Sequence, residues 1–198
     1  IREIFATEEF IVQQKNNDGF NMVSQKELER ISLLKSPKQV LALVEMPDEK
    51  NNHPINPEEL ILVLDGINDP GNMGSIIRTA DWFGIRKIYC SENCVEVYNP
   101  KVIQASMGSF ARITIFYVSL VDFLKTTPEG MPVYGAVLNG SNIYKKKLTS
   151  EGLIIIGSES HGISDEVLSF VDHKISIPEF SSSAEKVESL NASVATAI

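Results

Sequence analysis

The chain has 198 residues, of which 43% are hydrophobic and 22% are charged, and its net charge is −8. These values are typical of a globular protein with one large domain, or one domain and a smaller appendage. The negative charge argues against broad nonspecific binding to nucleic acid, but it leaves room for a local basic surface. The longest apolar runs are strand-sized and too short to cross a bilayer, so we expect no membrane association.

Residues 1–46 predict a small α/β unit. Strands are predicted at Phe10–Val12 and Val40–Val44, and between them an amphipathic helix from Ser24 to Leu34, whose Ser24 and Glu27 form a capping box. The chain does not begin with methionine, so we interpret residues 1–46 as part of a domain. Residues 47–58 are rich in turn formers and charge and predict a linker. Residues 59–198 then form a second domain.

Strands and helices alternate through the second domain. Strands are predicted at residues 61–64, 87–90, 113–116, 133–138, 153–156 and 174–177, and helices at 74–83, 100–107, 120–125, 164–170 and from about 183. The first strand is continuously apolar, as in a sheet that is covered on both faces. The pattern predicts an α/β fold with a mostly parallel sheet and helices on both of its faces.

Cysteine and histidine are too sparse to predict a metal site. Cys90 and Cys94 lie close together, a spacing that could suit a redox or metal site. No second cluster of Cys or His accompanies them, so we favour free thiols in a cytoplasmic protein. His161, in a glycine-flanked loop, is the one histidine that we consider for a site. The basic run Lys145–Lys147 is interpreted as a solvated turn.

Glycine-bearing polar loops follow four of the predicted strands. They occupy residues 65–74, 138–140, 157–162 and 177–179. Ligands bind at the carboxyl ends of strands in open parallel sheets, where glycine permits close approach and Asn, Ser and Glu supply hydrogen bonds. Gly71 and Gly74 lack the spacing of a dinucleotide fingerprint, and no Gly-Lys-Ser/Thr loop is present. The loops therefore predict a ligand site, for which a nicotinamide or ATP ligand is weakly supported; a nicotinamide oxidoreductase stays a third hypothesis that cofactor soaking would test.

Three segments resemble the signature motifs of the SpoU (TrmH-like) family of RNA ribose methyltransferases. The segment 68–84, NDPGNMGSIIRTADWFG, resembles the first motif, and 154–163, IIIGSESHGI, resembles the second. ISIP at 175–178 and ESLNASVA at 188–195 resemble the third. Residues 1–46 are more weakly similar to the latter part of the family's small RNA-binding domain, itself similar to a ribosomal protein. The segment 179–187 is longer than usual and has three serines in place of Met and Gly, so none of its residues is carried over.

The resemblance implies a fold, a reaction and an assembly. The fold is a SPOUT domain whose C-terminal part is threaded into a deep trefoil knot. The reaction is 2′-O-ribose methylation of ribosomal or transfer RNA with S-adenosylmethionine as methyl donor. The assembly is a homodimer, to which the apolar residues Val187, Leu190, Val194 and Ile198 of the last helix would contribute. Two alternatives stay open: a noncatalytic RNA-binding protein on the same fold, and an apolar helix face that the chain covers by itself.

The resemblance also assigns residues to the site. Those implied to bind the donor are Leu138, Asn139, Gly157, Ile177 and Leu190, although Ile177 and Leu190 could also be ordinary core residues. Those implied in catalysis are Asn72, Arg78, Glu159, Ser189 and Asn191.

The chemistry of these side chains separates their roles. Deprotonating an arginine near neutral pH costs about 9 kcal/mol, so we favour Arg78 as a phosphate clamp and as a stabiliser of the forming alkoxide rather than as a base. Glu159 either binds ribose hydroxyls of the donor or holds Arg78 or Asn72. The amides of Asn72 and Asn191 can orient other groups but cannot remove a proton. Which group takes the ribose proton stays open.

Overall fold

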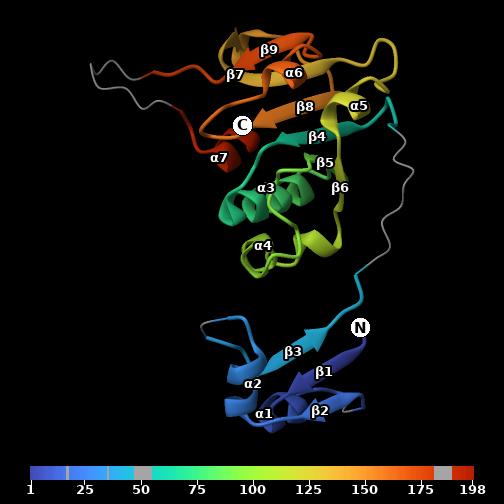
Figure 1. The fold of residues 1–198 in the computed structure, drawn as a ribbon, viewed down its shortest axis with the longest axis vertical. Coiled ribbons are helices and arrows are strands. Elements are labelled where there is room, and N and C mark those ends of the chain that lie inside the picture. The colour runs from blue at the N-terminus through green and yellow to red at the C-terminus, as the bar shows by residue number, and fades with distance from the viewer. Residues whose placement is uncertain (17, 35, 47–54, 181–188) are drawn as a thin grey trace. The chain divides into compact units, whose positions relative to one another are not determined.

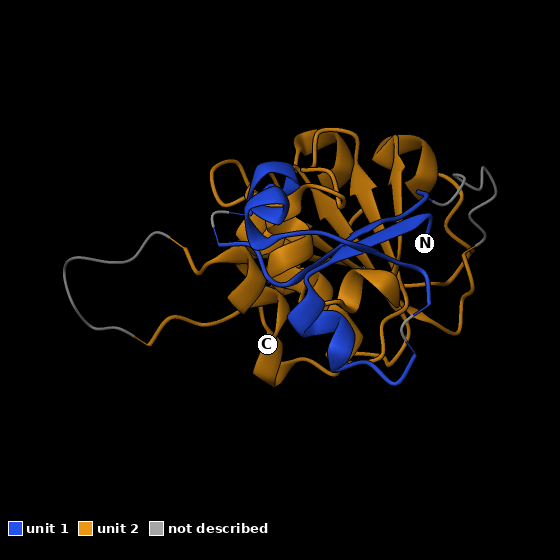
Figure 2. Ribbon diagram, turned by 90° about the horizontal axis from the view of Figure 1, so that it is seen from below, with its two compact units in different colours: residues 1–51 blue, residues 52–198 orange. Residues whose placement is uncertain are grey.

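The computed structural model describes residues 1–16, 18–34, 36–46, 55–180 and 189–198 (Figure 1). The chain forms two compact units, residues 1–51 and 52–198, which are coloured separately in Figure 2. Within the described ranges, none of the helices is both long and apolar enough to pass through a membrane.

The first unit contains a three-stranded sheet in the order β2–β1–β3. β1 (Glu3–Ala6) pairs in parallel with β2 (Phe20–Met22) and antiparallel with β3 (Val40–Leu43). β1 and β2 were not predicted from the sequence. Helices α1 (Glu8–Val12) and α2 (Gln25–Ile31) complete the unit.

One predicted strand of this unit is wrong. Phe10–Val12 belongs to α1, where the Thr7 side chain accepts a hydrogen bond from the Phe10 N–H and two glutamates occupy the first turn. A three-residue apolar run has no decisive periodicity, so the cap determines the element. The predicted capping box of α2 is confirmed, because Ser24 and Glu27 bond each other reciprocally. The helix ends at Ile31 rather than at Leu34.

The second unit is built on a six-stranded sheet. Its strands are β4 (Leu60–Asp65), β5 (Lys87–Ser91), β6 (Thr114–Val118), β7 (Val133–Asn142), β8 (Gly152–Gly157) and β9 (His173–Ser176). Their order in the sheet is β6–β5–β4–β8–β7–β9, and each pairing among the described residues is parallel. This confirms the predicted α/β class with a mostly parallel sheet.

Helices cover both faces of this sheet. They are α3 (Pro70–Trp82), α4 (Pro100–Ser106), α5 (Leu120–Leu124), α6 (Asp165–Leu168) and α7 (Ala192–Thr196). On one face, Leu62 and Leu64 of β4 pack in a core with residues of α3, α4 and α7. On the other face, Ile61 and Val63 pack with residues of α5 and α6. Successive side chains of a strand point to opposite faces, which explains why β4 is continuously apolar.

Two helix boundaries differ from the prediction. α3 begins at Pro70 instead of Gly74, because the Asp69 carboxylate accepts the Asn72 N–H at 2.8 Å and proline suits the first helical position. The last helix was predicted from about residue 183. Residues 181–188 lie outside the described ranges, and the described helix α7 begins only after Asn191, its N-cap.

The sheet order brings two motif-bearing loops together. β4 and β8 are neighbours near the middle of the sheet, and their last residues, Asp65 and Gly157, are paired. The loop to α3 leaves β4 at this edge, and the loop 157–162 leaves β8. The chain runs outward from β4 to β5 and β6 on one side, while β8, β7 and β9 lie on the other. Such a switch point is where ligands bind in open parallel sheets.

Candidate active site

Asn72, Glu159 and Asn191 form a closed triangle of hydrogen bonds. The Asn72 amide Nδ2 donates to Glu159 Oε1 at 3.1 Å. Asn191 Nδ2 donates to the same carboxylate oxygen at 2.8 Å and to Asn72 Oδ1 at 2.7 Å. One residue from each of the three sequence motifs therefore meets the other two.

Helix ends position this triangle. Asn72 lies in the first turn of α3 and is only 9% exposed. Asn191 caps α7, where its Oδ1 accepts the Ser193 and Val194 N–H groups at 3.0 and 3.3 Å. Glu159 Oε1 also accepts the Ala192 N–H at 3.0 Å, so three N–H donors converge on one carboxylate oxygen. Charge-assisted bonds of this kind hold the two helix ends and the loop after β8 in a fixed arrangement.

The loop after β8 is fixed from within as well. Ser158 and Gly162 exchange backbone hydrogen bonds at 3.1 and 2.8 Å. A Cβ atom added at Gly157 would lie 2.1 Å from the Gly162 carbonyl carbon, so any side chain there would disrupt the loop. Gly157 is therefore required for close packing of the loop on itself, whatever its role toward a ligand.

Asp65 ties the same loop to the end of β4, a role that the sequence analysis missed. Its side chain is 7% exposed, and its Oδ2 accepts both the N–H and the hydroxyl of Ser164 at 2.8 Å. The available signal was an acidic residue at the end of an otherwise apolar strand. A buried carboxylate with two donors stabilises the position of residues 157–164 relative to β4.

The two cysteines support the neighbouring loop. Both are free and buried, and Cys94 Sγ accepts the Ile67 N–H at 3.2 Å in the connection between β4 and α3. A hydrogen bond from Cys90, together with bonds from Ser91 and the backbone, lowers the pKa of Cys94 to about 7 despite its burial. Among the residues that the structure describes, no cluster of His, Cys, Asp and Glu could hold a metal ion. The Ile67 hydrogen bond ties this loop to the buried Cys94 thiol.

The other two catalytic candidates lie outside the triangle. Arg78 is exposed on α3, six residues beyond Asn72, and it has no hydrogen bond or ion pair within the described ranges. Ser189 is exposed two residues before Asn191. The fold therefore brings three of the five catalytic candidates into direct contact. Ser189 lies close to them along the chain, and Arg78 lies farther along α3.

Two of the candidate donor-binding residues, Leu138 and Asn139, lie at a break in the pairing of β7 with β9. The pairing of β7 with β9 shifts register between Ala136 and Ser141, so residues 137–140 leave the regular ladder. Leu138 in this segment is 72% exposed and Asn139 is exposed. Ile177, directly after β9, is half-buried.

Leu190 completes this set of residues. It is 48% exposed and is not part of either core, so the reading as an ordinary core residue does not fit it. Leu138 and Leu190 are both exposed, and apolar side chains suit the faces of a flat aromatic base, whose edge forms hydrogen bonds. Their assignment to the adenosyl group, which the sequence resemblance implies, stays a prediction.

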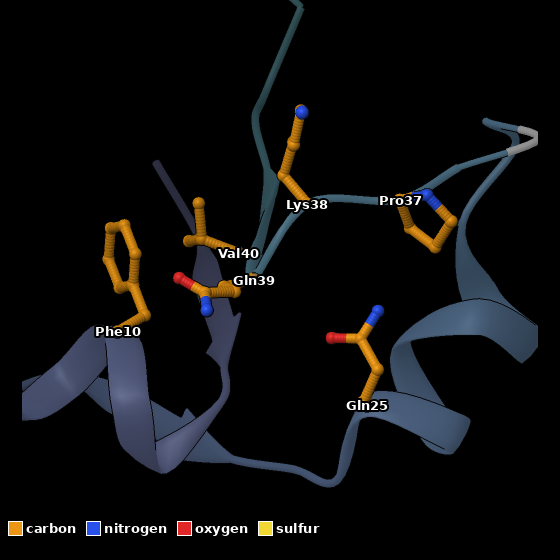
Figure 3. Close-up of a pocket in the computed structure, with 6 residues that line it drawn as sticks. All are labelled: Phe10, Gln25, Pro37, Lys38, Gln39 and Val40. Atoms are coloured by element: carbon orange, nitrogen blue, oxygen red, sulfur yellow. The ribbon is translucent and has the colours of Figure 1, made fainter.

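An open pocket of about 520 Å³ belongs to the first unit and contains none of these residues (Figure 3). It is lined by Phe10, Gln25, Pro37, Lys38, Gln39 and Val40.

The chain is similar to a known protein family. Residues 59–198 match the model of the SpoU rRNA Methylase family. The 23S rRNA (guanosine(2553)-2′-O)-methyltransferase RlmP of Bacillus subtilis is 29% identical over 204 residues, covering 100% of this chain and 78% of the relative. The 23S rRNA (uridine(2479)-2′-O)-methyltransferase of Streptomyces viridochromogenes is 30% identical over 172 residues, covering 81% of this chain and 58% of that protein.

Comparison with solved structures supports the same family. A TrmH-family structure from Porphyromonas gingivalis has a TM-score of 0.86 and 36% identity over 99% of this chain and 79% of that one. The SpoU methyltransferase AviRb from Streptomyces viridochromogenes, in complex with AdoMet, has a TM-score of 0.78 and 26% identity over 100% of this chain and 79% of that one. The motif residues, the parallel sheet and these similarities lead to one conclusion: the chain belongs to the SpoU rRNA methylase family.

Proposed function

We propose that this protein is an enzyme that transfers the methyl group of S-adenosylmethionine to a ribose 2′-hydroxyl of RNA. The observation that carries the proposal is the Asn72–Glu159–Asn191 triangle, because it joins all three family motifs at the carboxyl ends of β4 and β8. Three motif residues brought together at the strand ends where ligands bind favour a catalytic site over a noncatalytic RNA-binding protein. The relatives that are named as 2′-O-methyltransferases support the catalytic reading as well.

The donor supplies an electrophilic methyl group on a sulfonium. We assign Leu138, Ile177 and Leu190 to the faces of its adenine, and the backbone around Asn139 and Gly157 to its polar edge. The exposure of the two leucines supports this assignment.

The residues of the triangle act by orientation. A ribose hydroxyl is a weak acid, so its proton must be accepted and the developing charge stabilised. Glu159 Oε1 already accepts three N–H groups, so we assign Glu159 to holding Asn72 and Asn191 in place rather than to proton removal. Of the two roles considered for Glu159 from the sequence, this geometry favours the second.

Arg78 and Ser189 face the substrate in this proposal. The Arg78 guanidinium is exposed, so its five N–H donors can clamp a phosphate and stabilise the alkoxide. The Ser189 hydroxyl can donate or accept a hydrogen bond beside the reacting ribose.

Ribosomal RNA is the substrate that we favour, because two of the relatives are named for 23S rRNA. Transfer RNA is the second candidate.

We also propose that residues 1–46 are a partial RNA-binding domain, that residues 47–58 are a linker and that residues 59–198 are the methyltransferase domain. The free thiols of Cys90 and Cys94 support a cytoplasmic location.

The knot and the dimer complete the proposal. α7 packs in the same core as α3, and Asn191 reaches the loop after β8, which supports a C-terminal segment threaded into a trefoil knot. Val194 and Ile198 are each 49% exposed, which supports a second subunit that covers them. Of the other two residues of that apolar face, Leu190 is 48% exposed and precedes α7, and Val187 lies outside the described ranges. Static light scattering tests the dimer, and a mass near 21.9 kDa would contradict it.

Two measurements test the activity. Calorimetry with S-adenosylmethionine should show one site per chain. Mapping of ribose methylation in RNA from cells that lack the gene should show the loss of a specific 2′-O-methyl group, and the purified protein should restore it with the labelled donor. An unchanged methylation map and no methyl transfer to ribosomal or transfer RNA would contradict the proposal.

A further inference from the structure

The C-terminal end of α3 presents an aromatic side chain to solvent. Trp82, the only tryptophan of the chain, is 86% exposed. Large aromatic side chains are costly to leave in water, and their exposed faces are frequent platforms for other flat groups. Trp82 follows Arg78 by four residues, so the two side chains lie on one face of the helix about 6 Å apart.

The charged side chains near Trp82 on this part of α3 and its neighbours carry a net positive charge. Asp81 accepts hydrogen bonds from Arg112 at 2.8 and 2.6 Å and from Arg86 at 3.3 Å. Asp81 therefore compensates one charge of these two arginines. Arg78, which has no ion pair among the described residues, adds a further positive charge on the same helix. Three arginines thus stand against one carboxylate in a protein whose net charge is −8.

This combination suits single-stranded nucleic acid. Arginine guanidinium groups bind phosphates through bidentate hydrogen bonds, and an exposed indole can stack on a base of any sequence. The side chains of Arg86 and Arg112 remain 62% and 56% exposed although both contact Asp81. Their outer N–H groups therefore remain accessible to a phosphate.

A second copy of the chain is the less suitable occupant. A two-fold interface places the same surface of each subunit against its counterpart. A surface with three arginines and one carboxylate would then face a surface of the same sign, which is unfavourable. Polyanionic RNA has the complementary charge.

We infer that Arg78, Trp82, Arg86 and Arg112 form an RNA-docking surface on which the arginines bind phosphates and Trp82 stacks on an unpaired base of the substrate. The inference deepens the proposed function and rests on it. Arg78 lies between the active-site end of α3 and Trp82, which is about 15 Å along the helix from Asn72, so one bound RNA strand can reach both.

The fluorescence of Trp82 can report the binding of RNA directly. The full chain is titrated with oligouridylate of about ten nucleotides, a length within the site sizes of single-strand binding proteins. Since the protein has no other tryptophan, quenching of its fluorescence reports contact at this residue alone. We expect saturable quenching that weakens as salt increases, because phosphate binding releases counterions.

Variants separate stacking from charge. Binding of a fluorescein-labelled oligouridylate, measured by anisotropy, should weaken about tenfold or more for Trp82→Ala and little for Trp82→Phe, which keeps an aromatic face. Arg86→Gln should weaken binding and flatten the salt dependence. Lys125→Gln is the matched control, since it removes one positive charge from an ion pair on α5 without touching this surface. Its affinity should equal that of the unmodified protein.

The outcomes are distinct. Absence of quenching, or equal RNA affinity of Trp82→Ala and the unmodified protein, overturns the docking surface. Conversion of a dimer into a monomer by Trp82→Ala, seen by light scattering, assigns the surface to a second copy and also overturns it. Methyl transfer to ribosomal RNA is measured separately with the unmodified protein. Its absence contradicts the proposed function, whereas methylation with a raised KM for RNA in Trp82→Ala supports both.

Discussion

The two ends of helix α3 are organised in opposite ways. At its N-terminal end, Asn72 is 9% exposed, and its side-chain amide is bonded to Glu159 and Asn191. Toward its C-terminal end, Arg78 is exposed without a partner in the described structure, and Trp82 is 86% exposed. The N-terminal end pairs the Asn72 side chain within the chain, whereas the Arg78 and Trp82 side chains stay accessible to solvent.

This difference separates positioning from binding. A network whose donors and acceptors are already paired can hold a geometry, but it has few free groups with which to bind substrate. An exposed guanidinium has all of its donors available, but its position is defined only when a phosphate arrives. Substitutions in the network at the N-terminal end should therefore reduce turnover because the site loses its geometry. Substitutions of Arg78 or Trp82 should weaken the interaction with the RNA substrate.

The largest effect is expected from Glu159→Ala. This change removes the acceptor of three N–H groups and leaves the Asn72 amide without its carboxylate partner. We expect kcat for methyl transfer to fall about 100-fold or more, because Asn72 and Asn191 lose their positions and a misplacement of about 1 Å costs on the order of 100-fold. Glu159→Gln retains one carbonyl acceptor and should lose less.

The rate is measured with labelled donor and ribosomal RNA. Glu129→Ala, which removes an exposed carboxylate elsewhere in the second unit, is the control and should keep full activity. Near-normal turnover of Glu159→Ala would show that the triangle is not part of the catalytic machinery.

Arg78→Lys should give the next largest effect. Lysine keeps the positive charge but cannot form the two parallel hydrogen bonds of a guanidinium with a phosphate. We expect kcat/KM for RNA to fall about 10- to 100-fold, which corresponds to a loss of about 1.4–2.8 kcal/mol of transition-state stabilisation. The affinity for the donor should be unchanged. Steady-state kinetics together with calorimetry of the donor separate the two effects. Turnover close to that of the unmodified protein would exclude both the clamp and the base role of Arg78.

A substitution at Leu190 should weaken donor binding. Leu190→Ala removes apolar surface that we assign to the adenine, so the Kd for S-adenosylhomocysteine should rise about tenfold. Leu33→Ala is the control, because Leu33 is 82% exposed in the other unit. An unchanged Kd for Leu190→Ala would place the donor elsewhere. Gly157 is a poor test position, since a side chain there collides with Gly162 and disrupts the loop itself.

The smallest effect concerns stability. Asp65→Asn keeps the size of the side chain but removes the charge from the two hydrogen bonds with Ser164. We expect the free energy of unfolding to fall by about 1 kcal/mol in urea denaturation. Asp122→Asn, which breaks an exposed ion pair with Lys125, should show no measurable change. Equal behaviour of the two variants would mean that Asp65 does not fix the loop.

The elements that the sequence predicted well are those whose signals are local. β4 is a continuous apolar run, and the second unit alternates strands with helices, so the class of the fold followed from periodicity. The capping box at Ser24 was also correct, because all of its groups lie within four residues. Short segments were less predictable. Phe10–Val12 joined a helix because Thr7 capped it, and β1 and β2 gave too few residues for a pattern.

The sequence by itself determined the family, the parallel α/β architecture and the identity of the polar residues in the motifs, because residue type and spacing are properties of the chain. Only the tertiary structure decided which of those residues meet. Asn72, Glu159 and Asn191 come from distant segments, and their hydrogen bonds exist because β4 pairs with β8 and α7 packs in the same core as α3. The same packing left Arg78 and Trp82 in solvent and buried Asp65 against Ser164. Exposure and hydrogen-bond partners depend on residues far apart in the chain, and no local pattern encodes them.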